Sequence, residues 1–93
     1  MAEATPIRVE TTPNPNSLKF SVGRDVWGDR PLTVSDPLQA FTMPLAGRLL
    51  AVDGVRSVFF LRDFVTVARR PEAEWEPLRQ AVTAILQEHL AAA

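Results

Sequence analysis

Residues 55–68 read VRSVFFLRDFVTVA, and this stretch decides the fold. It contains two runs, Val55–Leu61 and Phe64–Ala68, that are rich in the β-branched and aromatic residues favoured in strands. Only Arg62 and Asp63 separate the runs. Two residues are too few for a helical crossover, so the strands are expected to pair antiparallel. The sequence therefore predicts a β-hairpin at the centre of the molecule.

A second hairpin is predicted near the N-terminus. Apolar and polar residues alternate over 7–11 and again over 18–22, which is the period of a half-buried strand. The intervening segment is dense in residues that shape turns, and it reads Thr12-Pro13-Asn14-Pro15-Asn16. Further along, residues 31–34 favour a short strand, and Trp27 is expected to be a partly buried anchor of the loop before it.

The first helix is predicted over about residues 43–52. Thr42 can cap it, and Pro44 suits the first turn, where a backbone N–H is not needed. Apolar residues then recur at helical spacing. Asp53-Gly54 is expected to end the helix, because glycine readily adopts the left-handed conformation found after helix C-termini.

The last helix is predicted over about residues 74–91. Its apolar face is formed by Trp75, Leu78, Val82, Ile85, Leu86 and His89. Glu72, Glu74 and Glu76 lie at its positive end, which favours carboxylates, and Pro77 is acceptable only in the first turn. We expect His89 to interact favourably with the negative end of the helix.

The element order is strand–strand–(strand)–helix–strand–strand–helix. It predicts an α+β fold, a two-layer sandwich in which two helices cover one face of an antiparallel sheet of four to five strands. The chain has 93 residues, which suits a single domain over residues 1–93 with an ordered core at about 7–91.

Composition excludes several kinds of chemistry. The sequence contains no cysteine, so this chain cannot form disulfides, use a catalytic thiol, or ligate zinc or an iron–sulfur cluster through cysteine. Asp25, Asp29 and Asp36 lack the spacing of a calcium loop, and His89 is the sole histidine. We therefore predict no catalytic residue, no metal ligand and no enzymatic activity.

Charge and hydropathy indicate the expected environment. The net charge is −1, which provides no electrostatic footprint for nucleic acid. Arg69 and Arg70 are interpreted as a solvated strand end. No apolar run reaches the roughly 20 residues that span a bilayer, and the N-terminus does not resemble a secretory signal. A cytoplasmic monomer that binds no membrane is expected.

Several segments occur in the order found in one family. They are TTPNPNSLKF (11–20), PLA (44–46), VDGVRSVFF (52–60), DFVTV (63–67) and Trp75. Together they resemble the N-terminal domain of NifU-like (Nfu-type) iron–sulfur cluster scaffold proteins over about residues 7–90. In that family a second domain holds the cluster with a Cys-x-x-Cys pair, and this sequence looks like a stand-alone form without it.

The resemblance implies an accessory role in iron–sulfur cluster assembly or delivery through protein contacts. Iron binding is a property of the family and is assigned to no residue of this chain, so a cluster is expected only indirectly, through a partner. The implied partners are iron–sulfur scaffold, carrier or client proteins. Two alternatives remain: a general protein- or peptide-interaction domain outside this pathway, and a small hydrolase or metal enzyme with oxygen and nitrogen ligands.

The expected contact residues lie in two turns and one strand. The prolines of the first turn can hold its asparagine amides outward, and Lys19 is placed on the outer face of its strand, where it could meet an acidic partner. An exposed sheet edge is a further possible docking site, by strand addition. The predicted partner-binding residues are Thr12, Pro13, Asn14, Pro15, Asn16, Lys19, Arg62 and Asp63.

Overall fold

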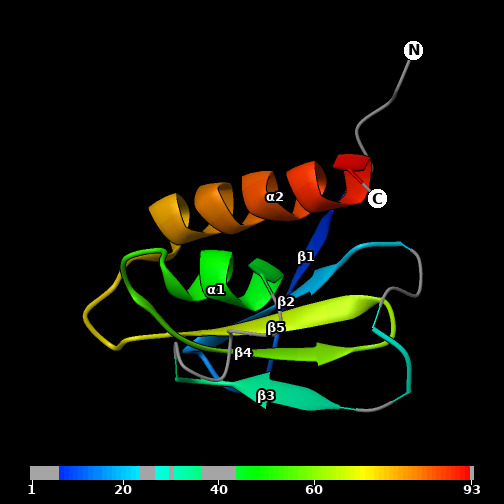
Figure 1. The fold of residues 1–93 in the computed structure, drawn as a ribbon. Helices are drawn as coiled ribbons and strands as arrows, with labels where there is room; N and C mark the ends of the chain where they lie inside the picture. Colours follow the sequence, from blue (N-terminus) through cyan, green and yellow to red (C-terminus); the bar gives the residue numbers. More distant parts are fainter. Residues whose placement is uncertain (1–6, 24–26, 30, 37–43, 93) are drawn as a thin grey trace.

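The computed structural model describes residues 7–23, 27–29, 31–36 and 44–92. Within these ranges the chain forms five strands and two helices (Figure 1). In chain order they are β1 (Arg8–Thr11), β2 (Ser17–Ser21), β3 (Leu32–Val34), α1 (Pro44–Leu50), β4 (Val55–Leu61), β5 (Phe64–Arg69) and α2 (Trp75–Ala92).

The strands form one sheet in the order β1-β2-β5-β4-β3, and every neighbouring pair is antiparallel. The two predicted hairpins, β1–β2 and β4–β5, join where β2 pairs with β5. In this register Val67 lies opposite both Leu18 and Val58, and Val65 lies opposite both Phe20 and Phe60. The alternating apolar residues of three strands therefore point to the same face of the sheet.

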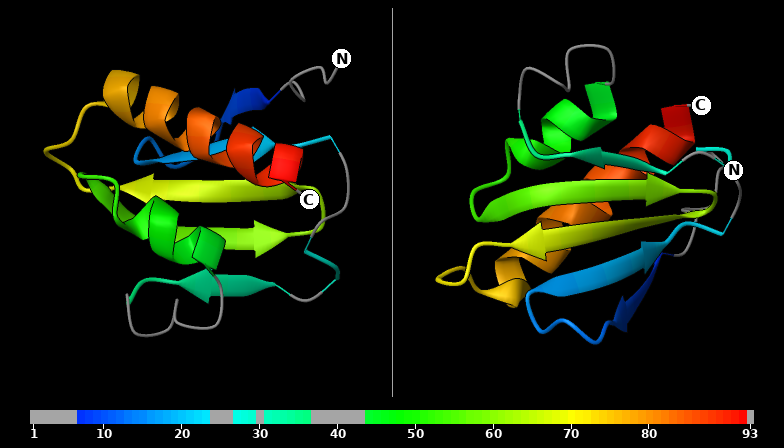
Figure 2. Two further views of the ribbon diagram at one scale, coloured as in Figure 1. Left: turned by 45° about the horizontal axis from the view of Figure 1, so that its top comes forward. Right: turned by 90° about the horizontal axis from the view of Figure 1, so that it is seen from below.

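Both helices cover that face (Figures 1 and 2). They bury Leu45, Ala46 and Leu49 of α1 and Leu78, Val82 and Leu86 of α2 against the sheet. The rest of the core comes from Leu18, Phe20, Val22, Val34, Val55, Val58, Phe60, Val65 and Val67. The α+β, two-layer prediction is confirmed, with five strands among the described residues.

The predicted boundaries differ most at α1. The helix begins at Pro44, and Thr42, the expected cap, lies outside the described residues. It ends at Leu50 because the backbone N–H of Val52 bonds to the carbonyl of Leu49, which tightens the chain into a turn. Gly54 then adopts a φ of 97°, so glycine ends this segment in the left-handed region as predicted.

The start of α2 follows the prediction closely. Trp75 is its first residue, and Glu76 and Pro77 lie in the first turn. The buried residues Leu78, Val82 and Leu86 recur every four positions, which forms the face that packs on the sheet.

Candidate protein-binding surfaces

The turn between β1 and β2 is held by its own polar side chains. The Thr12 hydroxyl accepts a hydrogen bond from the backbone N–H of Asn14 at 3.2 Å and donates to the Asn14 carbonyl at 2.8 Å. The Asn14 side-chain oxygen accepts from the N–H of Asn16 at 2.9 Å. Such side chain-to-backbone bonds stabilise turns locally. These atoms of the predicted contact residues therefore shape the turn.

Two residues distant in sequence attach this turn to the rest of the fold. The backbone N–H of Arg69 donates to the carbonyl of Asn16 at 2.8 Å, and its Nε donates to Asn16 Oδ1 at 3.3 Å. The Trp75 indole N–H donates to the carbonyl of Pro15 at 3.2 Å. The turn between β1 and β2 is thus connected to the end of β5 and to the start of α2.

Arg69 itself is half-buried, so its interpretation as part of a solvated strand end is wrong. Its Nη1 donates to the carbonyl of Ala73 at 2.7 Å, and its guanidinium lies 5.2 Å from the centroid of the Trp75 ring. The side chain is drawn inward because its stem and planar head find partners there. Arg70, in contrast, is exposed, as predicted.

The β4–β5 turn is connected to a different segment. Arg62 has a φ of 50°, its N–H donates to the carbonyl of Gly28 at 2.9 Å, and its Nε lies 3.2 Å from Asp29 Oδ1. Trp27 packs in the same loop, 4.8 Å from the Phe60 ring. Trp27 is half-buried, so its prediction as a loop anchor is confirmed.

The two predicted contact turns lie at opposite ends of β2. Asn16, just before β2, pairs with Arg69, whereas Val22, just after it, donates its N–H to the carbonyl of Asp63 at 2.8 Å. A strand of this length separates the two turns by about 17–20 Å. The structure therefore does not bring the turns together, and Lys19 lies midway between them.

Lys19 alternates with the buried residues Leu18 and Phe20, so it lies on the outer face of the sheet. No described element covers that face (Figure 2). Its Nζ is 4.5 Å from the centroid of the Phe64 ring, and the Phe64 and Phe59 ring centroids are 6.2 Å apart. Sequence reasoning missed these two aromatic residues as surface candidates. The available signal was their alternation with buried Val58, Phe60 and Val65.

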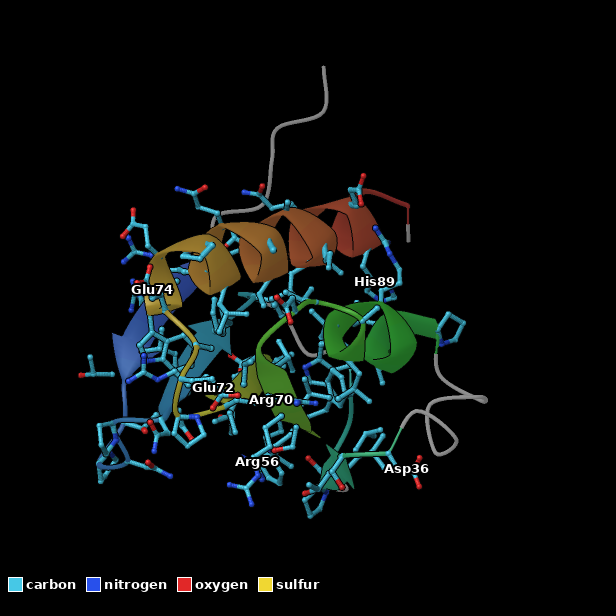
Figure 3. The ribbon with its side chains drawn as sticks, turned by 90° about the vertical axis from the view of Figure 1, so that its left-hand side faces the viewer. Asp36, Arg56, Arg70, Glu72, Glu74 and His89 are labelled. Carbon is cyan, nitrogen blue, oxygen red and sulfur yellow. The ribbon has the colours of Figure 1, made fainter. Side chains whose placement is uncertain are left out.

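An open groove of about 450 Å³ lies where β4 begins and β5 ends. Arg56, Arg70 and Glu72 line it and lie close together in Figure 3, with Ser35 and Pro71 completing the lining. Among the described residues, no group of three or more histidine or acidic side chains could hold a metal ion. The groove carries charges of both signs.

Known proteins resemble this chain in sequence and in fold. The family described as "Scaffold protein Nfu/NifU N terminal" matches residues 7–93. The chain belongs to the Nfu/NifU N-terminal family. Human NFU1 iron-sulfur cluster scaffold homolog, a protein named as mitochondrial, is 41% identical over 86 residues, which are 91% of this chain and 34% of the human protein. A NifU-like protein of Schizosaccharomyces pombe is 38% identical over 89 residues, covering 90% of this chain and 33% of that protein.

Solved structures show the same Nfu/NifU fold. The solution structure of a NifU-like protein from Saccharomyces cerevisiae has a TM-score of 0.86 at 25% identity and covers 97% of this chain and 82% of that one. A Staphylococcus aureus crystal structure has a TM-score of 0.73 at 29% identity and covers 85% of this chain and 95% of that one. The present chain spans about a third of the length of its curated Nfu relatives.

The cytoplasmic location predicted from the sequence is shown neither by the structure nor by the relatives. Within the described ranges, no helix of this Nfu/NifU domain is long and apolar enough to cross a membrane. The name of the human relative carries the word mitochondrial, which does not agree with a simple cytoplasmic assignment. The cytoplasmic location therefore stays a prediction.

Proposed function

We propose that this chain is a non-enzymatic protein-binding module that assists iron–sulfur cluster assembly or delivery without ligating a cluster itself. The observation that carries the proposal is the family match over residues 7–93 in a sequence that contains no cysteine. Cluster ligands would then come from another domain or another chain. The partners would be scaffold, carrier or client proteins of the pathway.

The outer face of the sheet supports a protein-binding role. The partly exposed ring of Phe64 lies next to the cation of Lys19, and the partly exposed ring of Phe59 lies beside Phe64. Aromatic side chains carry a large share of binding energy in protein interfaces, and a neighbouring charge adds orientation and faster encounter. This face extends between the two predicted contact turns, so a partner seated on it could contact Asn14 or Asp63 at its ends.

The isotopically labelled chain can be titrated with apo and cluster-loaded carrier proteins while backbone amide resonances are followed. We expect saturable shifts on the outer face, with a size-matched protein outside the pathway as control. Iron and sulfide reconstitution of the isolated chain should produce no visible cluster absorption. Stable cluster absorption, or no response to any carrier or client, would contradict the proposal.

The second candidate is a general protein- or peptide-interaction domain outside the iron–sulfur pathway. The same outer face favours it, because nothing in an aromatic and cationic surface is particular to cluster proteins. Affinity purification from cell extract separates the two. Repeated recovery of partners unconnected with cluster assembly would favour the second candidate, and enrichment of carriers or cluster-containing clients would favour the first.

A further inference from the structure

Strand β1 is an edge of the sheet, and no described strand pairs with its outer side. The hydrogen bonds of β2 reveal which backbone groups of β1 point outward. Asn16 and Val22 bond to β5 partners, so the even-numbered positions of β2 direct their backbone groups to β5. Bonding direction alternates along a strand, so Lys19 and Ser21 direct theirs to β1.

The partners of Lys19 and Ser21 on β1 are Glu10 and Arg8. These two residues therefore use their backbone groups within the sheet. Val9, between them, directs its N–H and C=O to the open edge, and so do Ile7 and Thr11. A further strand can add to β1 only through these outward groups.

The space beside this edge is suited to an added strand. An open groove of about 410 Å³ lies between Val9 and α2. The α2 side is formed by Arg79, Gln80, Thr83, Ala84 and Gln87. A strand that pairs with β1 would direct alternate side chains into this groove, as in peptide recognition by strand addition.

The charges of β1 indicate which strand would pair with its open edge. We propose that β1 binds β1 of a second copy of this chain, antiparallel and centred on Val9. Arg8 of each copy then lies opposite Glu10 of the other, and the two Val9 side chains meet at the groove. Arg8 and Glu10 are both exposed and both on the outer face, so the pairs form without burial of a charge.

Neighbouring registers are disfavoured. Outward groups must meet outward groups, so the pairing can shift only by placing Val9 opposite Ile7 or opposite Thr11 of the second copy. The first shift places Arg8 opposite Arg8, and the second places Glu10 opposite Glu10. Like charges directly opposite are destabilising. In the proposed register the opposite charges occupy the non-hydrogen-bonded pairs, in which side chains lie closest.

This pairing has the closed two-fold symmetry of most homodimers. Edges of four residues bury less than the ~1,000 Å² that a stable interface needs, so the dimer is weak and concentration-dependent. The sequence alone predicts a monomer, whereas the proposed pairing predicts reversible self-association at high concentration. The proposal does not depend on the iron–sulfur function.

Sedimentation velocity from micromolar to millimolar concentration tests the pairing. We expect the chain to associate reversibly, and Arg8→Glu and Glu10→Arg each to weaken association by about tenfold or more, because each places like charges opposite one another twice. An equimolar mixture of the two variants should associate again, since opposite charges then meet at both pairs. Arg56→Glu, on β4, is the matched control and should leave association unchanged.

Val9→Pro provides an independent backbone variant. It removes the outward N–H while keeping the β1–β2 bonds, and proline is tolerated in edge strands. It should abolish association with the far-ultraviolet circular dichroism unchanged. A chain that stays monomeric at every concentration would overturn the proposal. Association that is unchanged in the charge-reversal variants would also overturn it. So would the finding that the β1 edge binds an extended peptide of another protein but does not bind a second copy of this chain.

Discussion

The most informative stability test concerns Gly54, which links α1 to β4. Its φ is 97°, and a Cβ added there would lie 2.8 Å from the Cβ of Ala73 and 3.5 Å from both terminal methyl groups of Leu78. Gly23 has a φ of 85°, but among the described residues, its chain neighbours apart, no atom lies within 4 Å of the same added carbon. Gly54→Ala and Gly23→Ala therefore share the backbone strain and differ in the steric contact.

The backbone strain and the steric contact each have an expected cost in the free energy of unfolding. Left-handed backbone costs an L-residue about 1–2 kcal/mol, which is the full effect expected for Gly23→Ala. Overpacking adds about 1–3 kcal/mol at Gly54. Relief by movement is limited, because the Gly54 carbonyl accepts from Arg70 N–H at 2.8 Å and the Ala73 N–H donates to the Arg70 carbonyl at 2.9 Å. Gly54→Ala should therefore cost about 2–5 kcal/mol.

Urea denaturation followed by circular dichroism measures both variants. We expect Gly54→Ala to be less stable than Gly23→Ala by about 1–3 kcal/mol, with similar m-values, and its Tm to fall by roughly 4–8 °C for each kcal/mol. Adding Ala73→Gly to Gly54→Ala removes the closest contact and should restore part of the steric loss. Equal losses at the two glycines, or no recovery in the double variant, would refute the steric explanation.

Three further predictions address the turn, the core and the outer face. Arg69→Ala should lower the free energy of unfolding in urea by about 2 kcal/mol, because it removes two hydrogen bonds and a cation–π contact. A loss near zero would contradict the conclusion that Arg69 attaches the β1–β2 turn to the rest of the fold. Phe60→Ala, at a fully buried position, should cost about 3–5 kcal/mol, well above the cost of Phe59→Ala on the outer face; equal costs would contradict the assigned faces. Lys19→Glu should leave the fold intact and lower carrier or client affinity by about fivefold or more in calorimetry, whereas the matched reversal Arg79→Glu on α2 should have no such effect.

Much of the local structure was predictable, because it depends on short-range pattern. The 55–61 strand and its hairpin partner follow from β-branched and aromatic runs with a two-residue break. The buried face of α2 follows from helical spacing, and the end of the α1 segment follows from Gly54. The resemblance to the family could also be recognised from the sequence, because it depends on motifs of contiguous residues.

The partner-binding residues were predicted less completely. Lys19 was placed correctly on the outer face. The Phe64 ring beside it comes from β5 and the next ring, Phe59, from β4, and they come together only because β2 pairs with β5 and β5 with β4. The contacts from Arg69 to Asn16 and from Trp75 to Pro15 join residues 53 and 60 positions apart. No local pattern encodes such pairs.

By itself, the sequence determined the elements, the apolar face of each and the absence of cysteine ligands. Periodicity acts within a few residues, and composition is a property of the whole chain. Tertiary structure alone decided which strands meet, that the two predicted contact turns lie at opposite ends of β2, and that β1 forms an open edge. The physical reason is that strand order is set by burying all the apolar faces at once under two helices, and that requirement exists only in the folded chain.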